Sequence, residues 1–127
     1  MLGADVPTQI DLAEKYGEDV EWLERDHDKL IEQILEEEEN LITNHRQHID
    51  EVVSIVKDEM SLLNVVDKPG SDIEKYVEDL DKVLLNKISI ISKLREQLLN
   101  FHKHLKTEEE MSTLHKSITA QEIEKST

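Results

Sequence analysis

Six histidines are the residues of this chain whose type would best suit a metal site. His45 and His48 stand three residues apart and share one face of a predicted helix, whereas His102 and His104, two residues apart, point to different faces. His27 ends the only Glu-x-x-His spacing of the chain, and a two-metal site in a helical bundle needs that spacing on two helices. We therefore interpret the histidines as seam-edge or solvent residues and predict no metal and no cofactor.

Other catalytic patterns are weak. The acidic run Glu36–Glu39 spreads over about 300° of a helix, so its carboxylates do not converge on one cation, and a solvated face is the simpler interpretation. The chain has three glycines and no glycine-rich phosphate loop, and no Ser or Thr stands in an arrangement typical of a nucleophile. We predict no catalytic residue and no enzyme. A metal-dependent bundle enzyme is the alternative that stoichiometric zinc or iron would favour.

The composition of the chain limits the classes of molecule that it can bind. The 127 residues carry 15 basic and 30 acidic side chains, a formal net charge of −15, and no cysteine. Such a chain repels nucleic acid and anionic membrane, so we predict binding to neither, and we expect a protein partner. No span reads as a membrane helix or a signal peptide, which makes a soluble intracellular chain the default expectation. Few aromatics, glycines and prolines are typical of long helices.

One short interruption, Val65–Ser71, separates two long runs of helical apolar spacing. Pro69 disfavours a helix on both sides of itself, and Gly70 tolerates a turn conformation. Ser71 and Glu74 have the spacing of a capping box for the second helix. The predicted turn residues are Asp67, Pro69, Gly70 and Ser71. The predicted organisation is an N-terminal arm over 1–17 with the pattern of a short helix, a helical hairpin over 18–106 (helix 18–66, turn 67–71, helix 72–106), and a fraying helical or disordered tail over 107–127.

Apolar spacing indicates that each helix has more than one apolar stripe. The stripes predicted to form the seam run through Leu30, Ile34, Leu41, His45, His48, Val52, Val56, Glu59 and Leu63, and through Ile73, Val77, Leu80, Leu84, Ile88, Ile91, Leu94, Leu98, Phe101 and Leu105. Flanking stripes are predicted as a partner or self-association surface: Ile42, Ile49, Val53, Met60, Tyr76, Val83 and Ile90. Two helices alone bury too little apolar surface to offset the entropy of ordering. The short N-terminal helix, a second copy or a partner would supply the third layer.

Charge favours reversal of the chain at the turn. In an antiparallel pair, the acidic run Glu36–Glu39 faces the part of the second helix that carries Arg95, Lys103 and Lys106. The acidic side chains Asp50, Glu51 and Asp58 similarly face Lys82 and Lys87. Exposed ion pairs choose orientation better than they add stability. The predicted fold class is therefore all-α, a long antiparallel, coiled-coil-like helical hairpin completed to a bundle by the N-terminal helix or by self-association.

The block E-M-x-L-L-x-x-V-D-x-P-G at Glu59–Gly70 is the most specific motif in the chain. With the helices around it, over about Leu30–Leu105, it resembles the C-terminal region of the kinesin-13 proteins, the internal-motor kinesins that depolymerise microtubules. The resemblance implies a non-catalytic tail module concerned with dimerisation, motor regulation and partner recruitment. Its partner would be a kinesin motor or neck, or a second copy. The family's ATPase motor has no counterpart here, and neither has its basic neck, so direct microtubule binding is not predicted.

Two further expectations follow from these patterns. The resemblance implies a cytoplasmic location on the cytoskeleton, at microtubules or the spindle. The alternative function is a free-standing acidic coiled-coil adaptor with an unrelated protein partner. A motor domain encoded upstream in the same reading frame would favour the first function, and a true start codon at Met1 would favour the second.

Overall fold

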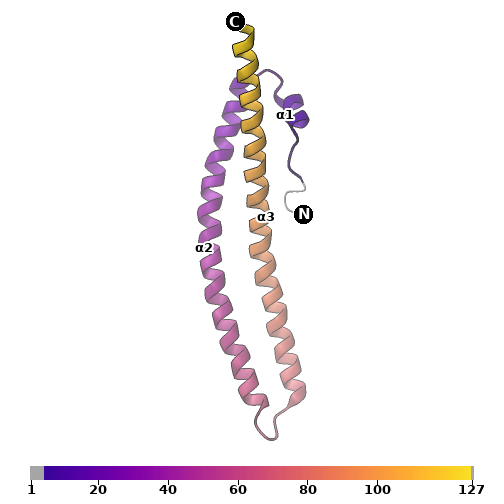
Figure 1. Cartoon of the computed structure of the whole chain (residues 1–127). Helices are drawn as coiled ribbons and strands as arrows, with labels where there is room; N and C mark the ends of the chain where they lie inside the picture. Colours follow the sequence, from indigo (N-terminus) through magenta and orange to yellow (C-terminus); the bar gives the residue numbers. More distant parts are fainter. Residues whose placement is uncertain (1–4, 127) are drawn as a thin grey trace. The chain divides into compact units, whose positions relative to one another are not determined.

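The computed structural model describes residues 5–126. The first four residues of the predicted arm and the last residue of the predicted tail lie outside this range. The described chain has three helices, α1 (Gln9–Tyr16), α2 (Val20–Val66) and α3 (Ile73–Ser126), and no strand (Figure 1). The fold is all-α, and the predicted long helical hairpin is confirmed. Two compact units divide the described residues: a turn unit, Leu41–Gln97, and a terminal unit, residues 5–40 with 98–126.

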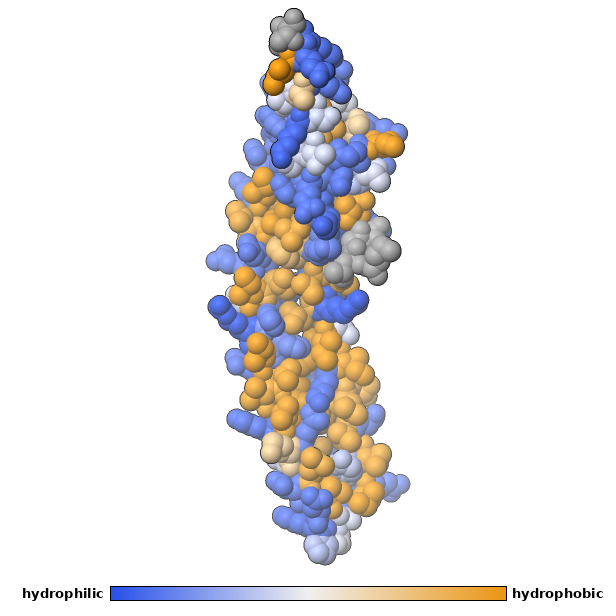
Figure 2. Space-filling view, viewed as in Figure 1, coloured by the Kyte–Doolittle hydropathy of each residue, from blue (hydrophilic) through white to orange (hydrophobic). Residues whose placement is uncertain are grey.

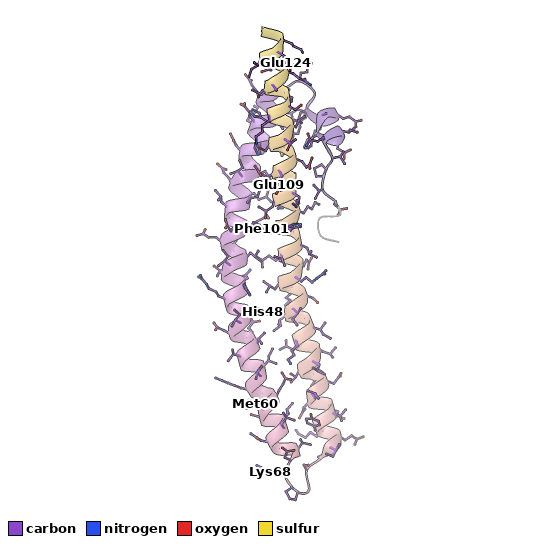
Figure 3. All side chains as sticks on the ribbon, in the orientation of Figure 1. His48, Met60, Lys68, Phe101, Glu109 and Glu124 are labelled. Carbon is purple, nitrogen blue, oxygen red and sulfur yellow. The ribbon has the colours of Figure 1, made fainter. Side chains whose placement is uncertain are left out.

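The turn unit contains the chain reversal predicted at Pro69. Its parts of α2 and α3 run side by side in opposite directions (Figure 1), and Lys68 lies in the connecting turn (Figure 3). The amide of Ser71 donates to the carbonyl of Lys68 at 3.3 Å, and Gly70 has a φ of 77°. Proline followed by a positive-φ glycine is the signature of a type II turn. The predicted turn residues therefore form the reversal.

The helix cap after this turn differs from the prediction. Asp72, not Ser71, caps α3, because its Oδ1 accepts a hydrogen bond from the amide of Lys75 at 3.1 Å. The Ser71 hydroxyl instead donates to the carbonyl of Val66 at 2.8 Å. That carbonyl ends α2 and has no partner within the helix, so Ser71 satisfies the preceding helix while Asp72 starts the next one.

The terminal unit holds the main core. α1 begins in a capping box, in which the Thr8 hydroxyl accepts from the amide of Asp11 at 3.1 Å and the Asp11 carboxylate accepts from the amide of Thr8 at 3.0 Å. The bond from the Thr8 amide, followed by hydrogen bonding of the Thr8 hydroxyl to the carboxylate, holds the pKa of the exposed Asp11 carboxyl below its usual value. The side chains of the core are Leu12 and Tyr16 from α1, Leu23 from α2, and Met111 and Leu114 from α3, with Leu30 and Ile118 packed against them. The short N-terminal helix is therefore a third layer in this unit.

A fraying helical or disordered tail was expected over 107–127, and the described part of this segment is helical. α3 continues as helix to Ser126, and Met111 and Leu114 are 3% and 7% exposed. The carbonyl of Glu110 also accepts a hydrogen bond from the Gln9 side chain at 2.7 Å. Contacts with α1, a hundred residues away in sequence, hold this segment in place. No helix within residues 5–126 has the length and apolar character needed to cross a membrane.

Candidate protein-interaction surface

The turn unit has a narrow seam between its two helices. Its partly or fully buried members recur at intervals of three and four residues, the spacing of one helical face. They are His48, Val52, Ile55, Glu59, Leu62 and Val66 on α2, and Tyr76, Leu80, Val83, Lys87, Ile90 and Leu94 on α3. Ile55, at 7% exposed, is the one buried apolar side chain of this unit. The hairpin is therefore thinly packed along Leu41–Gln97.

Polar pairs across the seam fix its antiparallel register. The Lys87 ammonium and the Glu59 carboxylate form an ion pair, with 31% and 24% of their side chains exposed. Farther from the turn, the Asn44 amide donates to the Gln97 side-chain oxygen at 3.0 Å. A shift of one helix along the other by a turn would separate the Glu59–Lys87 pair and leave two charges half-buried without partners. The pair therefore opposes sliding.

A second apolar stripe lies beside the seam on each helix, offset from the seam by one residue. Its members are 43–61% exposed. They are Ile42, Ile49, Val53, Val56, Met60 and Leu63 on α2, and Val77, Leu84, Ile88 and Ile91 on α3. We call these ten side chains the outer apolar face. In Figure 2, apolar surface gathers over both helices of the turn unit.

Helix geometry puts the two stripes on one side of the hairpin. A step of one residue turns the side chain by about 100°. Two antiparallel helices viewed from one end turn in opposite senses, so the residues that follow seam positions meet on the same side. The opposite side is a polar groove lined by residues that precede seam positions, among them Glu51 and Asp58 on α2 and Asn86 and Lys93 on α3. Each helix therefore contributes to one apolar and one polar side.

The predicted surface residues divide between two places. Ile42, Ile49, Val53 and Met60 are 45–60% exposed on the outer apolar face, and Met60 is marked on α2 in Figure 3. Tyr76, Val83 and Ile90 are instead half-buried in the seam, so they do not offer the exposed surface expected of them.

The stripes of α3 are partly interchanged relative to the prediction. Of the residues expected in its seam, Val77, Leu84, Ile88 and Ile91 are exposed, whereas Leu80 and Leu94 lie in the seam. The seam of α3 is less apolar than its outer stripe, because the seam includes Lys87. Lys87 can lie in the seam because its ammonium pairs with the Glu59 carboxylate. Apolar content alone therefore selected the wrong stripe, and these four exposed residues belong to the surface that the prediction missed.

The histidines of the terminal unit pair with carboxylates. His27 lies 3.0 Å from Glu108, His115 lies 2.9 Å from Glu24, and His104 contacts the Glu37 carboxylate. The acidic run was expected to lie near lysines and arginines of α3. Glu37 pairs instead with the imidazole of His104.

The remaining three histidines have other environments. His45 is exposed, His48 lines the polar groove, and the Nδ1 atom of His102 is buried without a hydrogen-bond partner. Within residues 5–126, no group of three or more His, Asp and Glu side chains has the arrangement to hold a metal ion.

Comparison with known proteins shows that the chain is similar to kinesin-like proteins. Over 82 residues, the chain is 44% identical to the kinesin-like protein KIN-13A of Oryza sativa subsp. japonica, a match that covers 65% of the chain and 10% of the rice protein. The chain is kinesin-13-like. Over 79 residues it is also 35% identical to the kinesin-like protein KIN-13B of Arabidopsis thaliana, covering 62% of the chain and 12% of that protein.

These matches confirm the resemblance that the Glu59–Gly70 block predicts. The kinesin-13-like chain spans only about a tenth of the length of these two relatives, so the similarity concerns one segment of them. No family model matches the chain, and no solved structure matches it.

Proposed function

We propose that this kinesin-13-like chain is a non-catalytic protein-interaction module, comparable to the tail of a kinesin-13, that acts in a microtubule-based process by regulating or recruiting the motor. The outer apolar face is its working surface. The observation that carries this proposal is an imbalance of burial: among apolar side chains the turn unit buries only Ile55, while ten apolar side chains beside its seam are 43–61% exposed. An exposed apolar patch of this extent is typical of a surface that another protein covers.

The polar side chains support the same proposal. Glu59 and Lys87 pair with each other, as do Asn44 and Gln97, so these groups hold one helix against the other. An interaction module needs this rigidity, because a surface that is already ordered loses less entropy on binding. The proposed location follows from the family: cytoplasm, on microtubules or the spindle.

A capture experiment tests this proposal. The full chain, immobilised, is offered a kinesin-13 motor–neck fragment and, separately, a second copy of the chain. A V53D/M60D variant places two charges on the outer apolar face, and we expect it to lose binding, because a carboxylate buried without a partner is strongly unfavourable. The matched control is S54D/S61D, which adds the same charges at the following exposed positions of α2.

The control variant should bind as the unmodified chain does. Equal binding by both variants would overturn the assignment of the surface. Binding of neither the kinesin fragment nor a second copy, together with capture of a basic protein through the acidic terminal unit, would favour the alternative of an acidic coiled-coil adaptor with an unrelated partner.

A further inference from the structure

We propose that a groove between α1 and the last turns of α3 is the docking site for a basic amphipathic helix of a partner protein. The groove has a volume of about 480 Å³, and all the residues that line it belong to the terminal unit. This inference goes beyond the proposed function, because the groove shares no residue with the outer apolar face. It gives the chain a second binding surface, for a partner of stated charge.

Aliphatic side chains from α1 and α3 line the groove. Leu114 and Ile118 lie on its α3 side, and Ile10 and Ala13 lie on its α1 side. Leu114 is 7% exposed and belongs to the core, whereas Ile10 is 71% exposed. Gly17 follows α1 in the lining, and a Cβ added to it would meet no atom within 4 Å. The groove therefore offers apolar surface that is continuous with the core of the terminal unit.

The backbone around the groove selects a helical occupant. Both walls are helices, and the described residues 5–126 include no strand. An extended peptide would find no sheet edge here, so its buried amide and carbonyl groups would lack partners. A helix satisfies these groups internally and presents apolar side chains at intervals of three and four residues. The α3 wall, Leu114–Lys125, is about 16 Å long at 1.5 Å per residue, the length of three helical turns.

Charge selects a basic occupant. The terminal unit carries 19 acidic and seven basic side chains, whereas the whole chain carries 30 and 15. The charged residues in the lining of the groove are Glu18, Glu122 and Lys125, and the Lys125 ammonium lies 4.0 Å from the Glu18 carboxylate. The groove thus has a net negative charge within an acidic unit. Such a site attracts a helix with lysines or arginines beside its apolar stripe and repels an acidic helix.

The test uses the full chain and two synthetic peptides that differ only in charge. Each peptide has about 15 residues, enough for a helix to form on binding, with leucines at intervals of three and four. The flanking positions are lysine in the first peptide and glutamate in the second. Fluorescence anisotropy measures the dissociation constants. We expect the lysine peptide to bind at least about ten-fold more tightly at low salt, and this difference should shrink as salt is added.

A charge placed in the groove should block the lysine peptide. A13R directs a long cationic side chain into the groove from an exposed position of α1. The dissociation constant should rise about ten-fold or more, because the arginine both occupies the groove and repels the peptide. T113R is the matched control, since it adds the same charge at an exposed position of α3 outside the lining. It should change the dissociation constant by less than about two-fold.

Loss of apolar surface from the groove should also weaken binding. I10S removes an exposed aliphatic side chain from the α1 wall, and the dissociation constant should rise about five-fold. L35S is its control, because Leu35 is 59% exposed on α2 of the same unit and does not line the groove. Circular dichroism should show unchanged helix content in all four variants, because the substituted side chains are exposed.

Three outcomes would overturn this proposal. Equal affinity for the two peptides, or no binding of the lysine peptide, would remove the basic helix as the occupant. Equal effects of A13R and T113R would remove the groove as its site. Self-association of the unmodified chain that A13R abolishes, with peptide binding unchanged, would assign the groove to a second copy instead.

The V53D/M60D variant separates this proposal from the proposed function. It should bind the lysine peptide as the unmodified chain does, because its charges lie on the outer apolar face. If V53D/M60D still captures the kinesin motor–neck fragment while A13R blocks the peptide, the outer apolar face is misassigned and the groove stands. If V53D/M60D loses the fragment while the lysine peptide fails to bind, the groove is overturned and the proposed function stands.

Discussion

The imidazole Nδ1 of His104 on α3 lies within hydrogen-bond distance of both carboxylate oxygens of Glu37 on α2, at 2.8 Å from Oε2. Both side chains are about one-fifth exposed. With His27–Glu108 and His115–Glu24, this contact makes three histidine–glutamate pairs between α2 and α3 in the terminal unit. Each pair joins residues that are far apart in sequence, so together they specify which turn of α2 faces which turn of α3.

The Glu37–His104 pair should contribute measurably to the stability of the terminal unit. In a double-mutant cycle with E37A and H104A, we expect a coupling free energy of about 0.5–1 kcal/mol, the usual range for a partly exposed pair. Denaturant unfolding monitored by circular dichroism measures it. The same cycle with E38A in place of E37A is the control, because Glu38 is exposed. Equal coupling for Glu37 and Glu38 would contradict the pairing.

Ile55 and Val56, which are neighbours on α2, should differ sharply in how much they contribute to the unfolding free energy of the chain. Ile55 is 7% exposed and Val56 is 44% exposed. I55A should lower the unfolding free energy of the chain by about 2 kcal/mol or more, because it leaves a cavity in the thin seam. At low protein concentration, where the chain is monomeric, V56A should lower the unfolding free energy by less than about 0.5 kcal/mol. Denaturation at low and high protein concentration separates the two effects, and equal losses at low concentration would mean that the seam is misassigned.

The turn should be sensitive to Gly70 for reasons of backbone conformation alone. Gly70 has a φ of 77°, and a Cβ at this position would meet no atom within 4 Å. G70A should therefore destabilise the chain by about 1 kcal/mol through the cost of left-handed backbone. Thermal unfolding checks this cost, with K68A in the same turn as the control. An unchanged melting temperature for G70A would show that the turn adopts another conformation in solution.

Tyr16 gives the terminal unit a dependence on alkaline pH. Burial, followed by the hydrogen bond to Asp26 at 2.7 Å, raises the pKa of the Tyr16 phenol above its usual value near 10. The folded state thus favours the neutral phenol. Its stabilising contribution is fully present below about pH 10, the pKa of an unfolded tyrosine, and is lost as the pH rises through the folded-state value.

Tyrosinate absorbance measures this shift. The chain has two tyrosines, so the Y76F variant reports Tyr16 alone. Its phenol should titrate at higher pH in the folded chain than in denaturant, and D26N should lower the folded value. Titration of Tyr16 near pH 10 in folded Y76F would refute the contact with Asp26.

Much of the fold could be predicted from local signals. Pro69 and Gly70 break the helical pattern between two long apolar repeats. The chain reversal and the ends of the helices near it could therefore be predicted from the sequence. α2 ends at Val66 and α3 begins at Ile73, as the turn chemistry indicates. The residues after Lys106 were predicted to form a tail because the apolar spacing weakens there. Their burial depends on contacts with α1, which no local pattern specifies.

The surface was harder to predict because each helix has two adjacent stripes of similar spacing. Which stripe faces the other helix depends on pairs such as Glu59–Lys87, whose charges make the seam look like surface. The more apolar stripe of α3, with Val77, Leu84 and Ile88, was therefore assigned to the seam although it is exposed. On α2, Ile49, Val53 and Met60 lie outside the seam as expected, but Val56 and Leu63, which were assigned to the seam, are exposed as well.

The single buried residue of the turn unit has a consequence for its motions. With only Ile55 buried, the helices of Leu41–Gln97 can open at little energetic cost, and their amide hydrogens should exchange with solvent faster than those around Leu23 and Met111. Covering the outer apolar face would slow this exchange. Hydrogen–deuterium exchange along α2 and α3 would thus record, peptide by peptide, when the chain is bound and when it is alone.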